Sequence, residues 1–100
     1  MTHNQVIFVG TVEREIKAFT GEKPLVSLFL KGATERGSVF MPVTVRGELA
    51  QKLISKVDNW QVGDEVYIEG ELDWESYEKN GEKRYQTVIS AKNVYKIESV

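Results

Sequence analysis

The chain has 100 residues, with 13 basic and 15 acidic side chains that leave a net charge of −2. This length suits one domain with its own core, so we expect a single domain over residues 1–100, and the charge excludes a globally basic nucleic-acid binder. The absence of cysteine excludes disulfides, thiol nucleophiles and thiolate metal sites, and it favours a cytoplasmic protein.

The first expected strand covers Gln5–Ile16. It holds four apolar residues in succession, Val6, Ile7, Phe8 and Val9. Because side chains alternate between the two faces of a strand, such a run needs cover on both faces. Gly10 follows the run and indicates a bulge or a sharp bend, by which a sheet curls into a small barrel.

The next two strands are predicted at Leu25–Leu30 and Val39–Val45, on either side of a loop over Lys31–Ser38. Pro42, inside the third strand, cannot donate a backbone hydrogen bond and therefore belongs at an edge or a bulge. The pattern then changes over Gly47–Val57, where apolar residues recur at helical spacing. One short helix is expected there, as a lid over the open end of a barrel.

The second half of the chain predicts one long hairpin. Its first strand alternates, and one face consists of Val66, Ile68, Gly70, Leu72 and Trp74. This alternation is typical of a half-buried strand and favours the core for Trp74. The alternative is exposure, because Trp74 lies near the end of the strand, where the barrel opens. The dipeptide Asn80–Gly81 tolerates the positive φ of a type I′ turn, and alternation resumes from Arg84 to Ile97.

The elements follow one another as strand, strand, strand, helix, strand, strand. This order matches the OB-fold, so the predicted class is all-β, a five-stranded Greek-key barrel with one helix between strands 3 and 4. Such barrels commonly bind oligonucleotides or oligosaccharides, but the fold does not decide the ligand.

The sequence argues against an enzyme. Its one histidine, His3, cannot complete a Ser/His/Asp triad from a position so close to the N-terminus. The acidic residues between Asp64 and Glu78 lack the spacing of a calcium loop and a proton-transfer partner, so we interpret them as a solvated face. We expect no catalytic residue, no metal and no cofactor. We also expect no membrane segment, because no apolar run approaches the roughly 20 residues that cross a bilayer.

Several segments resemble bacterial single-stranded-DNA-binding proteins. They are NQVIFVG at Asn4–Gly10, RGELA at Arg46–Ala50, GDEVYIEGEL at Gly63–Leu72 and, further on, NGEKRYQT. The resemblance covers nearly the whole chain in the same order. It implies an OB-fold that binds single-stranded DNA with little sequence preference, in replication, repair and recombination, as a homodimer or homotetramer. The choice between DNA and RNA stays open.

The resemblance places two aromatic residues, Phe40 and Tyr77, at positions where the family stacks bases. Ordinary packing is the alternative for both, and it weighs more for Phe40, since phenylalanine is often fully buried. Arg46 stands where the family has an aromatic residue. Its guanidinium group would then stack on a base or bind a phosphate.

The expected nucleic-acid-binding set is completed around the hairpin by Lys79, Lys83, Arg84 and Tyr85. For the cations, ordinary surface residues are the alternative. Tyr85 would equally stiffen the ribbon by pairing across it with the Tyr77 region. The acidic block between Asp64 and Glu78 repels phosphate, so we expect it to face away from the binding surface.

Oligomerisation is expected through the first strand. A small barrel has one interior, so one face of the segment made of Val6, Ile7, Phe8 and Val9 needs a second copy. No acidic tail follows Val100, so either the chain does not recruit replication and repair proteins through such a tail, or the tail has been removed.

Two alternative functions remain at this stage. The segment FMPVTVRG also resembles primosomal replication protein N, a related replication-restart factor. The second alternative is an OB-fold interaction module that binds proteins and no nucleic acid, which the negative net charge favours.

Overall fold

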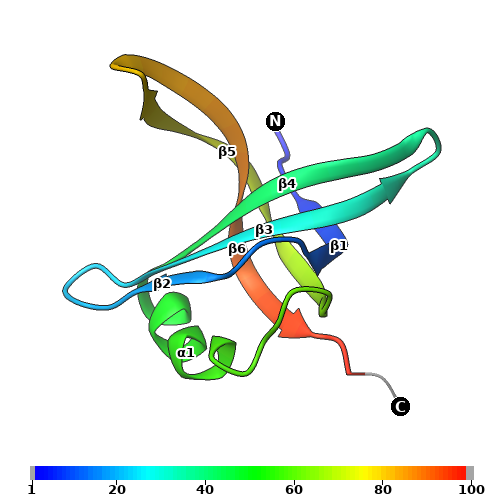
Figure 1. Ribbon diagram of the computed structural model, residues 1–100, viewed down its shortest axis with the longest axis vertical. Coiled ribbons are helices and arrows are strands. Elements are labelled where there is room, and N and C mark those ends of the chain that lie inside the picture. Colours follow the sequence, from blue (N-terminus) through cyan, green and yellow to red (C-terminus); the bar gives the residue numbers. More distant parts are fainter. Residues whose placement is uncertain (1, 99–100) are drawn as a thin grey trace.

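The computed structural model describes residues 2–98 and contains a six-stranded sheet and one helix (Figure 1). The elements are β1 (Val6–Val12), β2 (Lys17–Phe19), β3 (Leu25–Thr34), β4 (Gly37–Arg46), α1 (Gly47–Val57), β5 (Glu65–Lys79) and β6 (Glu82–Lys96). Their order in the sheet is β1-β5-β6-β4-β3-β2, and a pairing of β1 with β3 closes the barrel. The predicted barrel is confirmed, with β2 as a short additional strand beside β3.

The core lies inside the barrel and beneath α1, which covers one end (Figure 1). Alternate residues of β3 and one stripe of α1 point into it: Val26, Leu28 and Leu30 from the strand, and Ala50, Leu53 and Val57 from the helix. Each buried leucine or valine contributes about 1.5–3 kcal/mol relative to exposure. Within residues 2–98, no helix combines the length and apolarity needed to cross a bilayer.

Gly10 is required by close packing. The pairing of β1 with β5 runs without interruption through this residue, so the bulge predicted there is wrong. A Cβ atom would lie 2.7 Å from the carbonyl oxygen of Lys31 and 2.8 Å from the ring of Phe8, both too close for any side chain. The irregularity that bends the sheet lies instead between Glu69 and Gly70, in the pairing of β5 with β6.

Pro42 lies where its missing donor is harmless. It pairs with Phe29, whose carbonyl oxygen accepts a hydrogen bond from Glu13 on the other side of β3. Phe29 and Pro42 therefore form a non-hydrogen-bonded pair of the antiparallel ladder, and the backbone nitrogen of Pro42 faces β6. Since β4 pairs with β6 only at Val43 and Thr44, the predicted position at an unpaired edge is confirmed.

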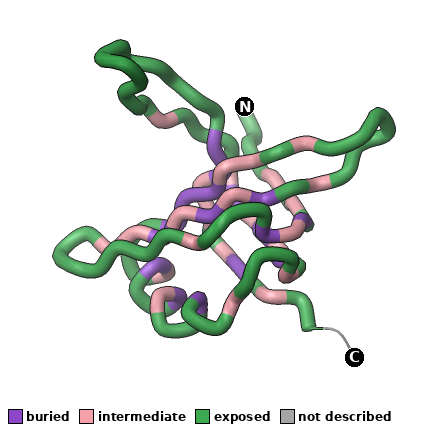
Figure 2. Tube along the Cα trace, in the orientation of Figure 1, coloured by how far each residue is buried: buried purple, intermediate pink, exposed green. Residues whose placement is uncertain are grey.

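Two hairpins extend beyond the barrel, and Figure 2 shows that their outer parts are exposed. The first is made by β3, which continues to Thr34, and β4, which begins at Gly37, so the loop predicted at Lys31–Ser38 is wrong. The N–H of Arg36 donates to Oγ1 of Thr34 at 3.2 Å within the tight turn. Both faces of this projecting hairpin meet water, so its strands need no alternation of apolar and polar residues. The segment therefore has the polar composition of a loop although it forms strands.

The second hairpin is the β5–β6 arm, by which we mean residues 71–90. Its turn is the predicted one, with φ of 53° at Asn80 and 78° at Gly81. The prediction that Trp74 is in the core is wrong, because this residue is 64% exposed. Beyond Gly70 the strand has left the barrel, so its inward-facing side continues into solvent.

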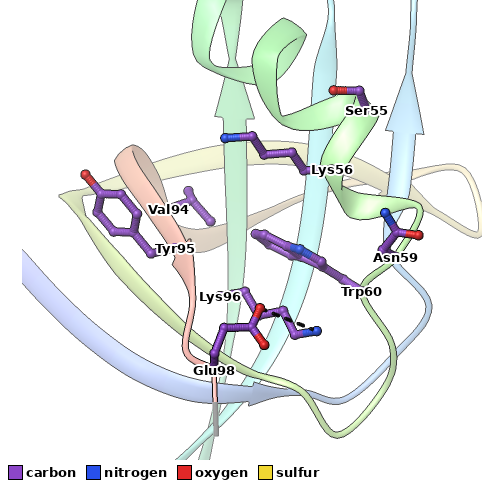
Figure 3. A pocket seen from close by; sticks show the side chains of 8 residues that line it. All are labelled: Ser55, Lys56, Asn59, Trp60, Val94, Tyr95, Lys96 and Glu98. Carbon is purple, nitrogen blue, oxygen red and sulfur yellow. Dashed lines mark ion pairs between the residues drawn. The ribbon is translucent and has the colours of Figure 1, made fainter. Parts of the chain in front are cut away.

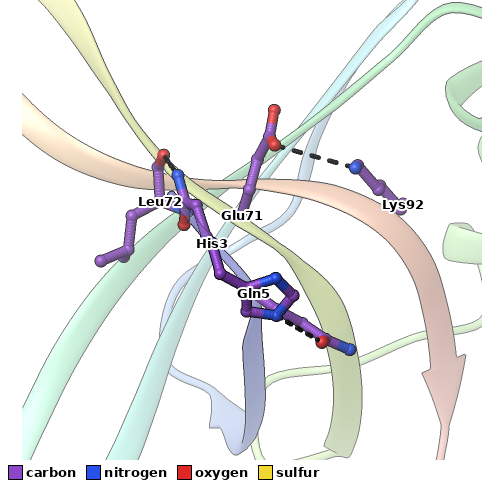
Figure 4. A network of polar contacts seen from close by, with 6 residues as sticks. His3, Gln5, Glu71, Leu72 and Lys92 are labelled. Atoms are coloured by element: carbon purple, nitrogen blue, oxygen red, sulfur yellow. Dashed lines mark hydrogen bonds and ion pairs between the residues drawn. The ribbon is translucent and has the colours of Figure 1, made fainter. Parts of the chain in front are cut away.

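Asn4 fixes the base of the arm. Its side-chain Nδ2 donates to the carbonyl oxygen of Leu72 at 2.8 Å, and its Oδ1 accepts from the N–H of Leu72 at 2.9 Å. The side-chain amide thus continues the pairing of β1 with β5, two residues beyond Val6 and Gly70. Figure 4 shows the polar contacts around this point, where Lys92 also lies 3.7 Å from Glu71.

Candidate nucleic-acid interface

A groove of about 210 Å³ lies on the outer face of β3 and β4, beside β6. Its lining includes Arg14, Lys17, Phe29, Pro42 and Gln86. The two central residues, Phe29 and Pro42, are partners in the pairing of β3 with β4. The groove therefore combines an aromatic ring with cations and an amide, which are the groups that contact bases and phosphates.

A row of stacked groups continues from this groove. The rings of Phe29 and Phe40 are parallel within 7°, with centroids 5.9 Å apart. The guanidinium carbon of Arg14 lies 4.0 Å from the centroid of Phe29. Phe40 is 48% exposed, so it is not buried in the core and its ring is accessible to a base.

Arg46 lies on the same outer face of β4, since it alternates with Phe40 and Pro42 along the strand. Its Nη2 donates to Oε1 of Glu75 at 2.6 Å, an ion pair between the barrel and the β5–β6 arm. A phosphate at Arg46 must therefore compete with Glu75. Such an exposed pair contributes little stability, about 0.2–1 kcal/mol, so this competition is weak.

The arm presents one of its faces to the groove. Its strands pair without a further shift from Gly70 to Lys79, so alternate residues stay on one face. Glu75 and Gln86 are opposite each other in the pairing of β5 with β6. Glu75 contacts Arg46, and Gln86 lines the groove. Tyr77 and Arg84 form the next pair on this face, and Lys79 follows at the tip.

The remaining predicted residues lie on the opposite face of the arm. The Tyr85 ring meets Trp74 edge to face, with centroids 5.3 Å apart and an angle of 66°. Nζ of Lys83 lies 5.8 Å from the centroid of Tyr85. The aromatic partner of Tyr85 is therefore Trp74 and not Tyr77. The structure brings Phe40, Arg46, Tyr77, Lys79 and Arg84 to the groove side and separates Lys83 and Tyr85 from them.

The acidic residues do not all face away from the groove, and that prediction is wrong for Glu71, Asp73 and Glu75, which alternate on the groove side of the arm. Others are held elsewhere, as Asp64 is by Lys96 at 3.4 Å. The N–H of Gln61 also donates to Oδ2 of Asp64 at 2.7 Å, and this hydrogen bond holds the pKa of Asp64 below its ordinary value. The groove side thus carries cations together with competing carboxylates, namely Glu15 in the lining and Glu71, Asp73, Glu75 and Glu82 on the arm.

Three residues of the interface were missed by sequence reasoning: Arg14, Phe29 and Gln86. The outward direction of Phe29 follows from its alternation with the buried Leu28 and Leu30, a signal that was present in the sequence. Arg14 and Gln86 carry no such signal. Their proximity depends on how the barrel closes and where β6 crosses β4.

A separate hollow of about 410 Å³ lies between α1 and the end of β6 (Figure 3). Trp60 lines it and packs against the core at the exit of the helix, as its position in the sequence suggests. Lys96 lines it as well, but it already pairs with Asp64 and lies 4.0 Å from Glu98. Lys56 and the ring of Tyr95 line this hollow too. What distinguishes the groove is the parallel pair of rings made by Phe29 and Phe40.

The barrel and its groove define an OB-fold protein of the kind that holds single nucleic-acid strands. The model of the Single-strand binding protein family matches residues 3–97, and the chain therefore belongs to that family. The predicted family is confirmed.

Solved structures support the fold, and 173 of their chains match this one. One is a deletion mutant of the single-stranded DNA binding protein from Thermus aquaticus, with a TM-score of 0.73 and 24% sequence identity. The match covers 96% of this chain and 51% of the other, so the chain spans about half the length of that protein. No curated protein sequence matches significantly.

Proposed function

We propose that this chain binds single-stranded DNA with little sequence preference, through the groove and the adjoining face of the β5–β6 arm. The row formed by Arg14, Phe29 and Phe40 beside an open groove is the observation that carries this proposal. Stacking on such rings contributes about 1–3 kcal/mol per base and tolerates every base. Membership of the family supports DNA as the ligand and a role in replication, repair and recombination.

Phosphate contacts make the smaller contribution in this proposal. Arg14 and Lys17 line the groove, and Arg84 extends the path along the arm, but Glu75 lies on the same side. Stacking therefore dominates affinity. The cytoplasmic location expected from the cysteine-free sequence belongs to the same proposal.

A direct test measures the anisotropy of a labelled oligothymidylate titrated with the wild-type protein and with Phe40→Ala. We expect binding by the wild type and an affinity about 5- to 150-fold lower for the variant. Val62→Ala, an exposed apolar residue outside the groove, serves as the control and should bind normally. Absence of binding by the wild type would favour the interaction module, and equal affinity of Phe40→Ala would place the strand elsewhere.

We propose in addition that two copies associate through β1. Val6 and Phe8 pack against the core, whereas Ile7 and Val9 are 59% and 47% exposed. Within residues 2–98, β1 pairs with β3 only at Thr11 and Val12, which leaves its other edge without a strand partner over residues 6–10. An apolar face next to an open edge favours pairing with a second copy, as a dimer or tetramer.

A further inference from the structure

The side of the β5–β6 arm that faces away from the groove carries an aromatic cluster. We call this side the back face. On β5 it consists of Leu72, Trp74, Ser76 and Glu78, and on β6 of Lys83, Tyr85, Thr87 and the buried Ile89. Trp74 and Tyr85 are 64% and 60% exposed although they contact each other. The pair contributes little to the core. Its contact across the strands stiffens the arm, but more than half of each side chain stays open to a ligand.

We propose that the back face is a second stacking site for the same single strand, with Trp74 and Tyr85 as base platforms and Lys83 as the phosphate contact. This inference rests on the proposed function. A strand that leaves the groove along Tyr77 and Arg84 reaches the tip of the arm, where residues 76–87 are all exposed. It can therefore pass from one side of the ribbon to the other without displacing protein.

The electrostatics of the two sides favour this path. On the groove side, the arm carries Glu71, Asp73, Glu75 and Glu82 against Lys79 and Arg84. On the back face, the charged residues beyond the barrel are Lys83 and Glu78, which lie opposite each other. The back face is thus the less acidic of the two and repels phosphate less.

The chemistry of the cluster fits bases better than another protein. A protein-docking surface presents a contiguous apolar patch, usually of several hundred Å² or more. Here the aromatic pair is bordered by the small polar residues Ser76 and Thr87, and of the two aliphatic residues at the base of this side Leu72 is exposed whereas its partner Ile89 is buried. Flat rings beside a cation are the arrangement by which sequence-tolerant single-strand binding is achieved.

The test uses the two tryptophans of the chain as separate reporters. Trp60→Phe leaves Trp74 as the emitter, and Trp74→Phe leaves Trp60, which lies in the hollow beside α1. Each protein is titrated with oligothymidylates of about 6 and about 16 nucleotides, near the limits of the site size of one OB-fold. We expect the longer strand alone to quench Trp74 and neither strand to quench Trp60.

Affinities from a labelled strand complete the test. Trp74→Ala should weaken binding of the longer oligomer by about 5- to 150-fold, leave the shorter one unchanged, and retain the wild-type melting temperature, whereas Trp74→Phe should keep most of the affinity. Normal binding of both lengths by Trp74→Ala, without quenching of Trp74, would overturn the inference while leaving the proposed function intact. A change in DNA-free self-association with normal DNA affinity would make the back face a protein contact and overturn it as well. Failure of the wild type to bind either strand would reject the proposed function itself, and this inference with it.

Discussion

Arg46 donates a 2.6 Å hydrogen bond to Glu75, and this contact joins strand β4 of the barrel to the β5–β6 arm. It places the groove face of the arm next to the outer face of β4 at Arg46. The same contact engages the guanidinium group of Arg46, which is expected from the sequence to stack on a base or to bind a phosphate. Arg46 therefore has two competing partners, a carboxylate of its own chain and a phosphate of the ligand.

Removing this competition should strengthen DNA binding. In Glu75→Gln, Arg46 loses its ion pair, and we expect single-strand affinity to rise by about 0.2–1 kcal/mol, with a steeper salt dependence. Titrations at several salt concentrations measure both quantities. Glu98→Gln makes the same change of charge beside Lys96, away from the groove, and should change neither. Lower affinity in Glu75→Gln would mean that the ion pair holds the arm in its binding position.

The wild-type protein should show a shallow salt dependence. With few cations and Glu75 beside them, we expect two to four phosphates to be neutralised per barrel, at a slope of about −0.7 for each. The logarithm of affinity for one fixed oligonucleotide is plotted against the logarithm of salt concentration. A much steeper slope per subunit would show that phosphate contacts outweigh stacking.

Tyr77 should contribute to binding and little to stability. Tyr77→Ala is expected to weaken single-strand binding by about 1–3 kcal/mol, and Tyr77→Phe to restore it, because the ring and not the hydroxyl group stacks. Melting of Tyr77→Ala should stay close to wild type, whereas Leu28→Ala in the core should cost about 2–5 kcal/mol. An intact affinity in Tyr77→Ala would assign this ring to the structure of the arm alone.

Charge on the outward face of β1 should break the oligomer. Ile7→Glu and Val9→Glu place a carboxylate on the exposed apolar face, where burial against a second copy would desolvate it. Sedimentation at micromolar concentration should give a dimer or tetramer for the wild type and smaller species for these variants. Val62→Glu, in an exposed loop, is the control for added charge. A monomeric wild type at tens of micromolar would contradict association through β1.

Asp64 should make stability depend on acid pH. Its pKa is held below the ordinary 3.8 by the N–H of Gln61 and by Lys96, so the folded state binds this proton less readily than the unfolded state. The stabilisation is present above about pH 4 and is lost as the pH falls through the lowered pKa. Urea unfolding between pH 2 and 6 should therefore show a smaller loss on acidification in Asp64→Asn. Parallel pH profiles of the two proteins would exclude this role.

The sequence predicts which faces are buried better than it predicts where burial ends. Alternation placed Val66, Ile68 and Trp74 on one side correctly, but the barrel stops near Gly70, and alternation says nothing about the length of the strands that cover a face. The same limit explains the error at Lys31–Ser38. Asn80–Gly81 was predictable because its dihedral angles are a local property.

The interface could be predicted only in part. Family resemblance singled out Phe40 and Tyr77, which the structure brings to the groove side together with Arg46. Arg14 and Gln86 join them only through closure of the barrel and the crossing of β6, so no local pattern marks them. Tyr85 and Lys83 fall on the other side of the arm because the two-residue turn at Asn80–Gly81 pairs them with Ser76 and Glu78 and not with Tyr77.

The central claim is that bases stack on the row of aromatic rings beside the groove. Ultraviolet cross-linking of an oligothymidylate of about 6 nucleotides, followed by mass spectrometry of the cross-linked peptides, identifies the contacting residues directly. The predicted result is cross-linking at Phe29, Phe40 and Tyr77. Cross-links confined to Tyr67 and Tyr95, on the outer side of the β5–β6 sheet, would contradict it.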